Sequence, residues 1–406
     1  IQEIESQPIL QWVFGATIFS YFVTFNGWIY KLSTSVASLK DGTHLCWPYF
    51  QACEQFVFLE ALPYGYSQTT WYMVLFGLLI TAVYYIYKND WVSAHVAILP
   101  AFFWHVFVIF IMDASMQGNF DYYLFFFALI LLFLPHKEFF LKLAVVIFYF
   151  LSTAAKIHPS WVAGSYFSTL KTGLPLFPDW SIPIWTNLVI FMEMIGAWFL
   201  MSRHILLQRS VLVFFIIFHL YSGILVGYHY PSIVLPTLLI LFGPMYRYTE
   251  VPWDRKSIVG WILVGLLFVS HSIPHVIRGD EKLTLEGNYY GLYMFEANHQ
   301  CVSSINVHYT DGSSYEDRRE SISARYRCDP YRYWSSLKKL CDRSTIPVAN
   351  IEWTFDHSVN GGPFLRIVDV PNVCVLDYKP FSHNEWIKTE TDNPVIIGTP
   401  VRNVFY

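Results

Sequence analysis

Charged residues are scarce in this chain, and several motifs that commonly mark chemistry are missing. Only 14% of the 406 residues are Asp, Glu, Lys or Arg, against about 25% in soluble globular domains. The Lys and Arg residues form no basic stripe, and the net charge of −4 gives no sign of a nucleic-acid partner. There is no internal repeat, phosphate-binding glycine loop, HExxH, CxxC or nucleophile elbow. We therefore expect neither a bound metal nor a nucleic-acid ligand.

Long apolar runs dominate the sequence instead. Hydrophobic residues make up 54% of it, and a membrane-spanning helix needs roughly 17 to 25 mostly apolar residues. The sequence therefore predicts an all-α polytopic membrane bundle followed by a small α+β, strand-rich extracytoplasmic domain. The transmembrane domain is expected at 1–277 and the outer domain at 278–406. The nine predicted spans are 9–30, 71–87, 91–112, 120–135, 138–155, 182–202, 210–228, 231–246 and 257–276.

Basic residues in the short loops indicate how the spans are oriented. With the N-terminus in the cytoplasm, seven Lys and Arg residues lie in cytoplasmic loops and four in the opposite loops, which is the usual bias. This arrangement puts all six cysteines on the non-cytoplasmic side, where disulfides persist; buried free thiols are the alternative. We expect a multi-pass membrane protein, in contact with lipid, whose C-terminal domain faces the ER lumen, the periplasm or the exterior.

Short-range patterns predict the elements of the outer domain. Ile305, Val307 and Tyr309 alternate with polar residues before an Asp-Gly pair, which is typical of a strand entering a hairpin. The stretch "DPYRYWSSLKKLCDRS" predicts a helix capped by Asp329. Two further strands are expected on either side of Asn360-Gly361-Gly362.

Lys156 follows the apolar run that ends the fifth predicted span. One interpretation is a lysine that anchors the helix end by extending its ammonium into the interface. The other is a buried amine, because burial disfavours the ammonium and makes the neutral amine a competent base. The Pro- and Gly-rich segment after it favours the second interpretation, since irregular backbone at membrane depth is tolerated where it lines a cavity.

Other polar side chains fall within predicted spans, where ionisable groups are costly and commonly functional. Each could equally be a satisfied interhelical hydrogen bond. The residues concerned are Asn119, Glu193, His219, His95 and His105, with His229 at a span end.

The ordered set of these motifs resembles one known family. "AAKIHPSWVAGSYFSTLKTGLPLFP" is similar to the lysine-bearing segment of vitamin K-dependent gamma-glutamyl carboxylase and of its bacterial relatives with the horizontally transferred transmembrane domain. Further stretches resemble the family in the same order along nearly the whole chain. They include "GNFDYYLFFFALILLFLP", "FHLYSGILVGYHYPSIVLPTLLILFG", "LEGNYYGLYMFEANHQC" and "SLKKLCDRSTIPVANIEW".

The resemblance implies a mechanism and a set of site residues. In that family a neutral lysine deprotonates a reduced quinone, which reacts with oxygen to give a strong base; that base takes a glutamyl proton, and carbon dioxide adds. The implied co-substrate is vitamin K hydroquinone or another quinol, and the implied partner is a secreted peptide or protein. By this match the catalytic residues are Lys156, Tyr293, Asn119 and His219; the quinol-binding residues are Trp161, Glu193 and Tyr122; and Cys53 pairs with Cys341.

Two departures from the family pattern alter these expectations. The carboxylase has a histidine after the active-site asparagine, whereas Phe120 follows Asn119 here and cannot transfer a proton. The sequence also stops at Tyr406, before the large lumenal portion that docks propeptide-bearing substrates in the carboxylase. A non-carboxylating protein that matures a secreted peptide, and a catalytically inactive membrane scaffold, are therefore the alternatives. A transporter is disfavoured because paired intramembrane charges and inverted halves are missing.

Overall fold

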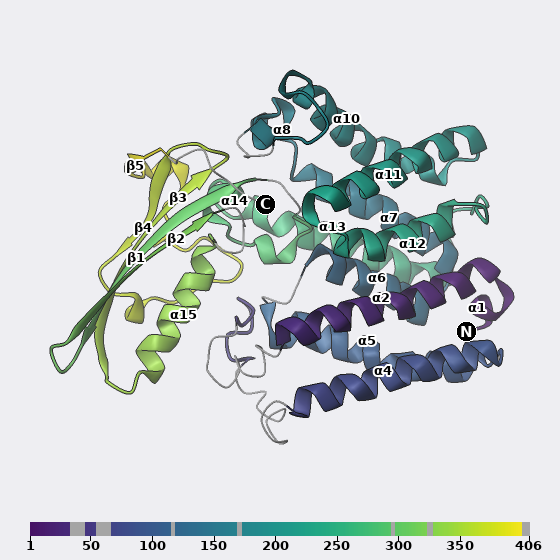
Figure 1. The fold of residues 1–406 in the computed structure, drawn as a ribbon, viewed down its shortest axis with the longest axis horizontal. Coiled ribbons are helices and arrows are strands. Elements are labelled where there is room, and N and C mark those ends of the chain that lie inside the picture. Colours follow the sequence, from purple (N-terminus) through teal and green to yellow (C-terminus); the bar gives the residue numbers. More distant parts are fainter. Residues whose placement is uncertain are drawn as a thin grey trace. The chain divides into compact units, whose positions relative to one another are not determined.

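A computed structural model of the chain describes residues 1–32, 45–53, 66–114, 118–168, 173–293, 297–322 and 328–399. The described chain is mostly helical, with one small antiparallel sheet near its C-terminal end (Figure 1). Contacts divide it into two compact units. Unit 1 comprises residues 1–47, 52–151 and 191–268, and unit 2 comprises residues 48–51, 152–190 and 269–406. The boundary predicted near residue 278 thus falls inside unit 2, which also takes residues 152–190.

Apolar helices build unit 1. Because their side chains are apolar on most faces, these helices can be buried or face lipid all round. The main helices of unit 1, including three that continue into unit 2, are α1 (Gln2–Ser6), α2 (Pro8–Leu32), α4 (Tyr66–Tyr87), α5 (Trp91–Phe107), α6 (Asn119–Phe133), α7 (Lys137–Ala154), α10 (Ile182–Met194), α11 (Ile205–Val226), α12 (His229–Phe242) and α13 (Ile258–Val276). A π-helical turn, Val108–Met112, prolongs α5, and a 3₁₀ helix, Gly196–Met201, follows α10.

Every predicted span coincides with helical structure, but only some helices could cross a membrane unaided. Among the described residues, five segments are long and apolar enough: Pro8–Ile29, Thr70–Tyr87, Trp91–Met112, Ile205–Leu225 and Arg255–Val276. They support an integral membrane protein. Helices α6 and α12 are apolar but shorter. Two other predicted spans differ for separate reasons: α7 begins with charged residues, and α10 passes into a 3₁₀ helix after thirteen residues.

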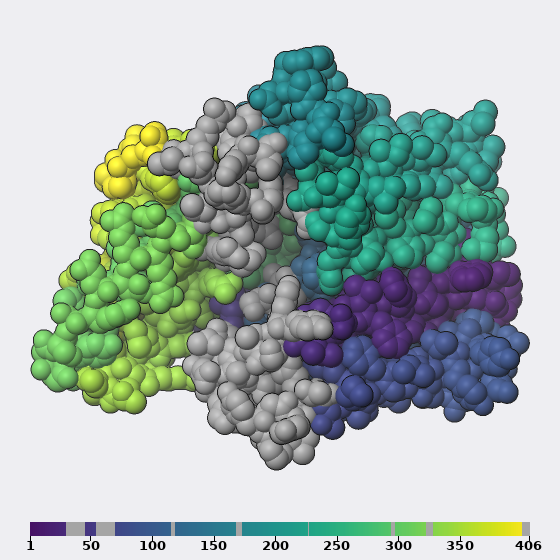
Figure 2. Space-filling model, viewed as in Figure 1, coloured from purple at the N-terminus to yellow at the C-terminus, as the bar shows by residue number. Residues whose placement is uncertain are grey.

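Close helix contacts hold unit 1 together. Helix α2 lies beside α4, as the purple and blue surfaces show (Figure 2), and it also packs against α12 and α6. Helices α13 and α7 approach where Gly260 meets Phe140, because a Cβ at Gly260 would lie 2.2 Å from the Phe140 ring. A larger side chain at Gly260 would require the Phe140 ring to move.

Buried charges gather near the start of α7. Lys142 is fully buried, and its Nζ is 2.7 Å from Glu138 Oε1 and 2.6 Å from the Arg247 carbonyl oxygen. Arg247 Nη2 lies 2.6 Å from Glu138 Oε2. The two cations neutralise the carboxylate, so the cluster is a satisfied structural element.

Unit 2 contains the sheet, in which all neighbours are antiparallel and the strand order is β2-β1-β3-β4-β5. The strands are β1 (His299–Tyr309), β2 (Ser314–Ile322), β3 (Val348–Val359), β4 (Phe364–Val370) and β5 (Ile396–Gly398). Both predicted hairpins are confirmed. Gly312 in the first turn, and Asn360 and Gly361 in the second, have positive φ, which suits hairpin turns.

The predicted helix of the outer domain is confirmed as α15 (Pro330–Arg343) (Figure 1). Asp329 caps it by accepting a hydrogen bond from the Tyr331 N–H at 2.9 Å. The helix packs on β3, where the Tyr333 ring lies 5.0 Å from that of Phe355. Shorter helices of unit 2 are α8 (Pro159–Val162), α9 (Ser165–Ser168) and α14 (Glu281–Thr284).

All six cysteines form disulfides, but the predicted link between Cys53 and Cys341 is wrong. The pairs are Cys46–Cys53, Cys301–Cys328 and Cys341–Cys374, with Cα separations of 5.4, 5.5 and 5.6 Å. Each cysteine of the predicted pair is bonded to a nearby cysteine of its own unit, and a sulfur that has formed one disulfide cannot form a second.

Candidate functional site

Lys156 lies just beyond the last turn of α7. Its N–H donates to the Thr153 carbonyl at 2.8 Å, and its own carbonyl accepts from the His158 N–H at 2.9 Å, which turns the chain toward α8. The residue is only 2% exposed, and Nζ lies 5.6 Å from the centroid of the Trp161 ring. An anchoring lysine would carry its ammonium into water, so this burial favours the alternative interpretation.

The segment after Lys156 is held by a glycine and an aromatic pair. Gly164 has φ +75°, and a Cβ there would lie 2.9 Å from Ile182 Cγ2. The Trp161 ring stacks on that of Tyr166 at 5.1 Å. The side-chain amide of Asn298, just before β1, donates to the Tyr166 carbonyl at 2.7 Å. These contacts fix the indole that faces Lys156.

Tyr293 is buried within a second cluster of unit 2. Its hydroxyl donates to Glu281 Oε2 at 3.2 Å, and the same oxygen is 2.6 Å from His275 Nδ1. The His271 ring stacks on the Tyr293 ring, with centroids 5.2 Å apart. Sequence reasoning missed these partners, although the spacing in "HSIPH" puts His271 and His275 one turn apart within the last predicted span.

The remaining predicted site residues belong to unit 1. His219 is buried, and its Nε2 is 2.5 Å from the Tyr149 hydroxyl. Glu193 is buried in α10. Asn119 begins α6, and the half-buried Tyr122 ring lies 6.0 Å from that of Phe110. Lys156, Trp161 and Tyr293 thus belong to unit 2. The four residues of unit 1 are Asn119, Tyr122, Glu193 and His219.

Aromatic and imidazole side chains meet near the start of α6. The Phe120 ring contacts the His229 ring edge to face, with centroids 4.2 Å apart. His105 on α5 and Asp121 on α6 are both fully buried, with Nε2 and Oδ1 3.5 Å apart. His105 thus faces Asp121 across two helices, but neither of its nitrogens forms a hydrogen bond within the described residues, so the expectation of a satisfied interhelical hydrogen bond is not met.

Two buried histidines couple strands β1 and β3. His357 Nδ1 is 2.7 Å from the Leu283 carbonyl oxygen, and its Nε2 is 3.0 Å from His299 Nδ1. Burial lowers the pKa of His357 to about 4. The imidazole is therefore neutral at physiological pH and serves as a hydrogen-bonding link.

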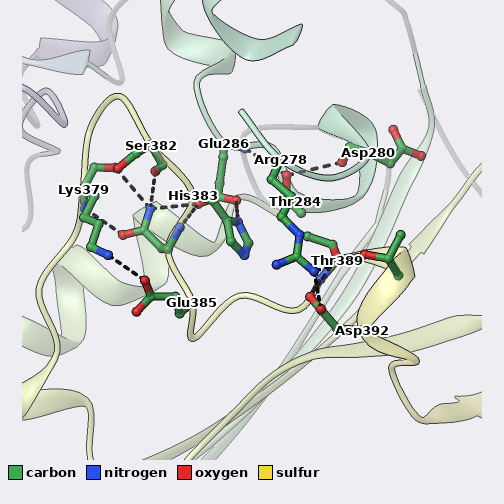
Figure 3. A network of polar contacts seen from close by, with 12 residues as sticks. Arg278, Asp280, Thr284, Glu286, Lys379, Ser382, His383, Glu385, Thr389 and Asp392 are labelled. Atoms are coloured by element: carbon green, nitrogen blue, oxygen red, sulfur yellow. Dashed lines mark hydrogen bonds and ion pairs between the residues drawn. The ribbon is translucent and has the colours of Figure 1, made fainter. Parts of the chain in front are cut away.

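A separate polar network surrounds the buried carboxylate of Glu286 (Figure 3). Its Oε1 accepts from the Asn384 backbone and side-chain N–H groups, each at 2.8 Å, and Oε2 is 2.8 Å from His383 Nδ1. Burial raises the pKa of Glu286, although these hydrogen bonds oppose the rise. Because both oxygens are satisfied, the network fastens the 379–385 loop and is structural. Arg278–Asp392 and Lys379–Glu385 ion pairs flank it.

The predicted site residues form no metal centre within the described residues, and they lie outside the cavity that borders the sheet. The described residues contain no group of three or more His, Cys, Asp or Glu side chains placed to hold a metal ion. A cavity of about 610 Å³ lies between β1, β2 and α15, with apolar Val307 and Leu337 and charged Arg319 and Arg332 among its lining residues. None of the predicted site residues lines it.

No family model matches the sequence, and no curated protein or solved structure is detectably similar to it.

Proposed function

We propose that the protein is an integral membrane enzyme of the vitamin K-dependent carboxylase-like class, which oxidises a quinol with oxygen at the outer face of the membrane. In this proposal the nine predicted spans form the bundle. The sheet of unit 2 faces an oxidising compartment, a topology supported by its two disulfides, Cys301–Cys328 and Cys341–Cys374. The carbon acid that the enzyme finally modifies is a side chain of a secreted peptide.

The observation that carries this proposal is the burial of Lys156 against Trp161. In this proposal the enclosed amine is the general base that accepts a proton from the bound quinol. The Trp161 ring stacks on that of Tyr166 in a buried aromatic cluster beside the amine. Lys156 takes the proton from a quinol hydroxyl in this scheme, and Trp161 positions the ring.

Tyr293 is the second proposed site residue of unit 2. Its hydroxyl is held by Glu281, and its ring is held by His271. A tyrosine so fixed can steer a reacting oxygen, which is the role that the family resemblance implies. The family resemblance also assigns roles in the quinol reaction to Asn119, His219, Glu193 and Tyr122, which belong to unit 1.

A second candidate function is quinol oxidation without carboxylation, in the maturation of a secreted peptide. The observation that favours it is Phe120, whose ring packs edge to face on His229. A phenyl ring there offers no group that transfers a proton to or from a glutamyl carbon.

The first experiment measures quinol oxidation directly. Purified protein in nanodiscs is given vitamin K hydroquinone and oxygen, and the quinone epoxide is quantified. We expect epoxide from the wild-type protein and a loss of about 10³-fold or more in Lys156→Ala, because a positioned general base contributes about 10²–10⁴-fold. Wild-type protein that makes no epoxide from any of several quinols would contradict the proposal.

Lys88 provides a matched control within the chain. It also ends a predicted span and lies near aromatic rings, with Nζ 5.8 Å from the Tyr84 centroid and 5.9 Å from that of Tyr87. Unlike Lys156, it is exposed. Lys88→Ala is therefore expected to keep full epoxide formation; equal losses in both variants would mean that the effect is not specific to the proposed base.

Incorporation of labelled carbon dioxide separates the two candidate functions. A glutamyl peptide is supplied with ¹⁴C-bicarbonate under conditions in which epoxide forms. Label in the peptide supports carboxylation, whereas epoxide without label supports the non-carboxylating function.

A further inference from the structure

His271 presents an unused hydrogen-bond donor deep in unit 2. The residue lies on α13 and is only 4% exposed. Its Nδ1 accepts a hydrogen bond from the Leu292 N–H at 3.1 Å. A neutral imidazole that accepts at one nitrogen carries its proton on the other, so the Leu292 contact assigns the proton to Nε2.

The Nε2–H of His271 is enclosed and has no hydrogen-bond partner among the residues that the structure describes. Leaving a buried N–H unsatisfied is costly, so such a group usually indicates a water, an ion or a ligand. An N–H donor requires an acceptor atom, which excludes a hydrocarbon or a cation as the group that completes it.

The surroundings of His271 hold its ring in a fixed plane. Its ring lies at 27° to that of Tyr293. Gly291 permits this arrangement, because a Cβ there would lie 2.4 Å from Tyr293 Cε2 and 3.0 Å from His271 Nδ1. The Leu292 N–H holds the imidazole at Nδ1, on the side of the ring away from Nε2. The donor direction is therefore set before any ligand binds.

The stacked partner is fixed as well. The Tyr293 hydroxyl is bound to Glu281, whose Oε1 is also 3.2 Å from Lys282 Nζ and whose Oε2 is paired with His275. The His271 and Tyr293 rings are stacked, and the His271 Nε2–H has no hydrogen-bond partner among the described residues. A flat ring with oxygen acceptors could stack on such rings and accept the hydrogen bond.

We propose that His271 is a substrate-binding residue that donates its Nε2–H to a ring oxygen of the quinone or quinol. This inference rests on the proposed function and extends it by assigning a binding donor beside Tyr293. The ligand class is an aromatic ring with a carbonyl or phenolate oxygen.

The experiment measures the binding of an oxidised naphthoquinone, ¹³C-labelled at its carbonyl carbons, to the full-length protein in nanodiscs without oxygen. The dissociation constant and the infrared carbonyl bands are recorded. We expect a carbonyl band lowered in frequency in the wild-type protein. In His271→Phe, which keeps a ring but lacks the donor, the lowering disappears and the dissociation constant rises about tenfold, the usual effect of one hydrogen bond.

Two further variants control for folding and specificity. His271→Gln has an oxygen that can accept from Leu292 and an amide that can donate, so it should retain the lowered band. His95→Phe changes a histidine of unit 1 that is outside the proposed site, and its dissociation constant should stay within about twofold. If His271→Phe does not fold, the wild-type protein labelled with ¹⁵N-histidine provides the test, because quinone must shift an imidazole band that is missing in His271→Gln.

The outcomes distinguish this inference from the function on which it rests. Wild-type protein that binds no quinone overturns both. Quinone binding with the same affinity and the same carbonyl bands in wild type and His271→Phe overturns only the role of His271. If quinone leaves the imidazole bands of the ¹⁵N-histidine-labelled protein unchanged, the role of His271 is likewise overturned.

Discussion

Buried lysines lie near the start and just beyond the end of helix α7, and their surroundings differ. Near its start, Lys142 lies 2.7 Å from the Glu138 carboxylate and donates to a backbone carbonyl. Just beyond its end, Lys156 faces the indole ring of Trp161 in an irregular segment. Burial alone therefore does not indicate a base. Both amines lie near an aromatic ring, because Lys142 Nζ is 4.7 Å from the centroid of the Tyr246 ring. What sets Lys142 apart is the Glu138 carboxylate, which neutralises its charge and makes it part of the fold, whereas Lys156 is the proposed base.

The largest expected difference between the two lysines concerns turnover. Lys156→Met removes the amine but keeps a similar volume, so we expect epoxide formation to fall about 10³-fold. The melting temperature should be unchanged or higher, because an apolar side chain of similar volume replaces a buried polar amine. A clear loss of stability with normal turnover per folded molecule would place Lys156 in the structural class with Lys142.

Lys142→Met should have the converse effect. It leaves Glu138 with Arg247 as its cation partner, so the loss of stability should be smaller than the about 3–5 kcal/mol that a fully unpaired buried charge costs. Turnover per folded molecule should remain near the wild-type value. The double variant Glu138→Gln with Lys142→Met should recover part of the stability, because neither buried charge then remains; no recovery would show that the ion pair is not the source of the effect.

The disulfides of the two units are expected to differ in their contribution. Cys341–Cys374 closes a loop of 33 residues in unit 2, and Cys46–Cys53 closes one of 7 in unit 1. Loop-closure entropy predicts losses of about 4 and about 2 kcal/mol when each pair is replaced by alanines. Thermal unfolding of the two double variants measures this order, and the reverse order would contradict it.

The sheet of unit 2 should weaken in mild acid because of His357. Its pKa is lowered to about 4 by burial, so the unfolded chain binds a proton near pH 6.5 while the folded sheet does not. The stabilisation is complete above pH 6.5 and is lost as the pH falls toward 4, by about 3 kcal/mol. Melting temperatures between pH 7.5 and 4.5 should show a smaller slope for His357→Phe, whereas His308→Gln on β1 should keep the wild-type slope.

Local patterns in the sequence predicted most elements but not their long-range partners. The Asp-Gly and Asn-Gly-Gly turns, the Asp329 cap and the apolar runs are short-range signals, and the structure has the corresponding hairpins and helices. Cysteine pairing depends on where distant segments meet, and the family resemblance gave the wrong partner for Cys53. The partners of Tyr293 were missed for the same reason, since Glu281 and His271 approach it only through the folded chain.

The same limit applies to the site assigned by resemblance. Lys156 stood out because an amine followed an apolar run and preceded a Pro- and Gly-rich segment. His271 did not stand out, although it too is polar within a predicted span. Its proposed role as a donor depends on Nδ1 accepting the Leu292 N–H, which leaves the proton on Nε2. The sequence does not show that contact.

The bond from the Asn298 amide to the Tyr166 carbonyl affects how this protein can be dissected. A fragment cut before residue 278 would carry the strands but lose the 152–190 stretch that belongs to the same compact unit. Such a fragment would leave the buried Asn298 amide without the Tyr166 carbonyl that accepts its hydrogen bond. A fragment designed to carry the strands should therefore include residues 152–190 as well.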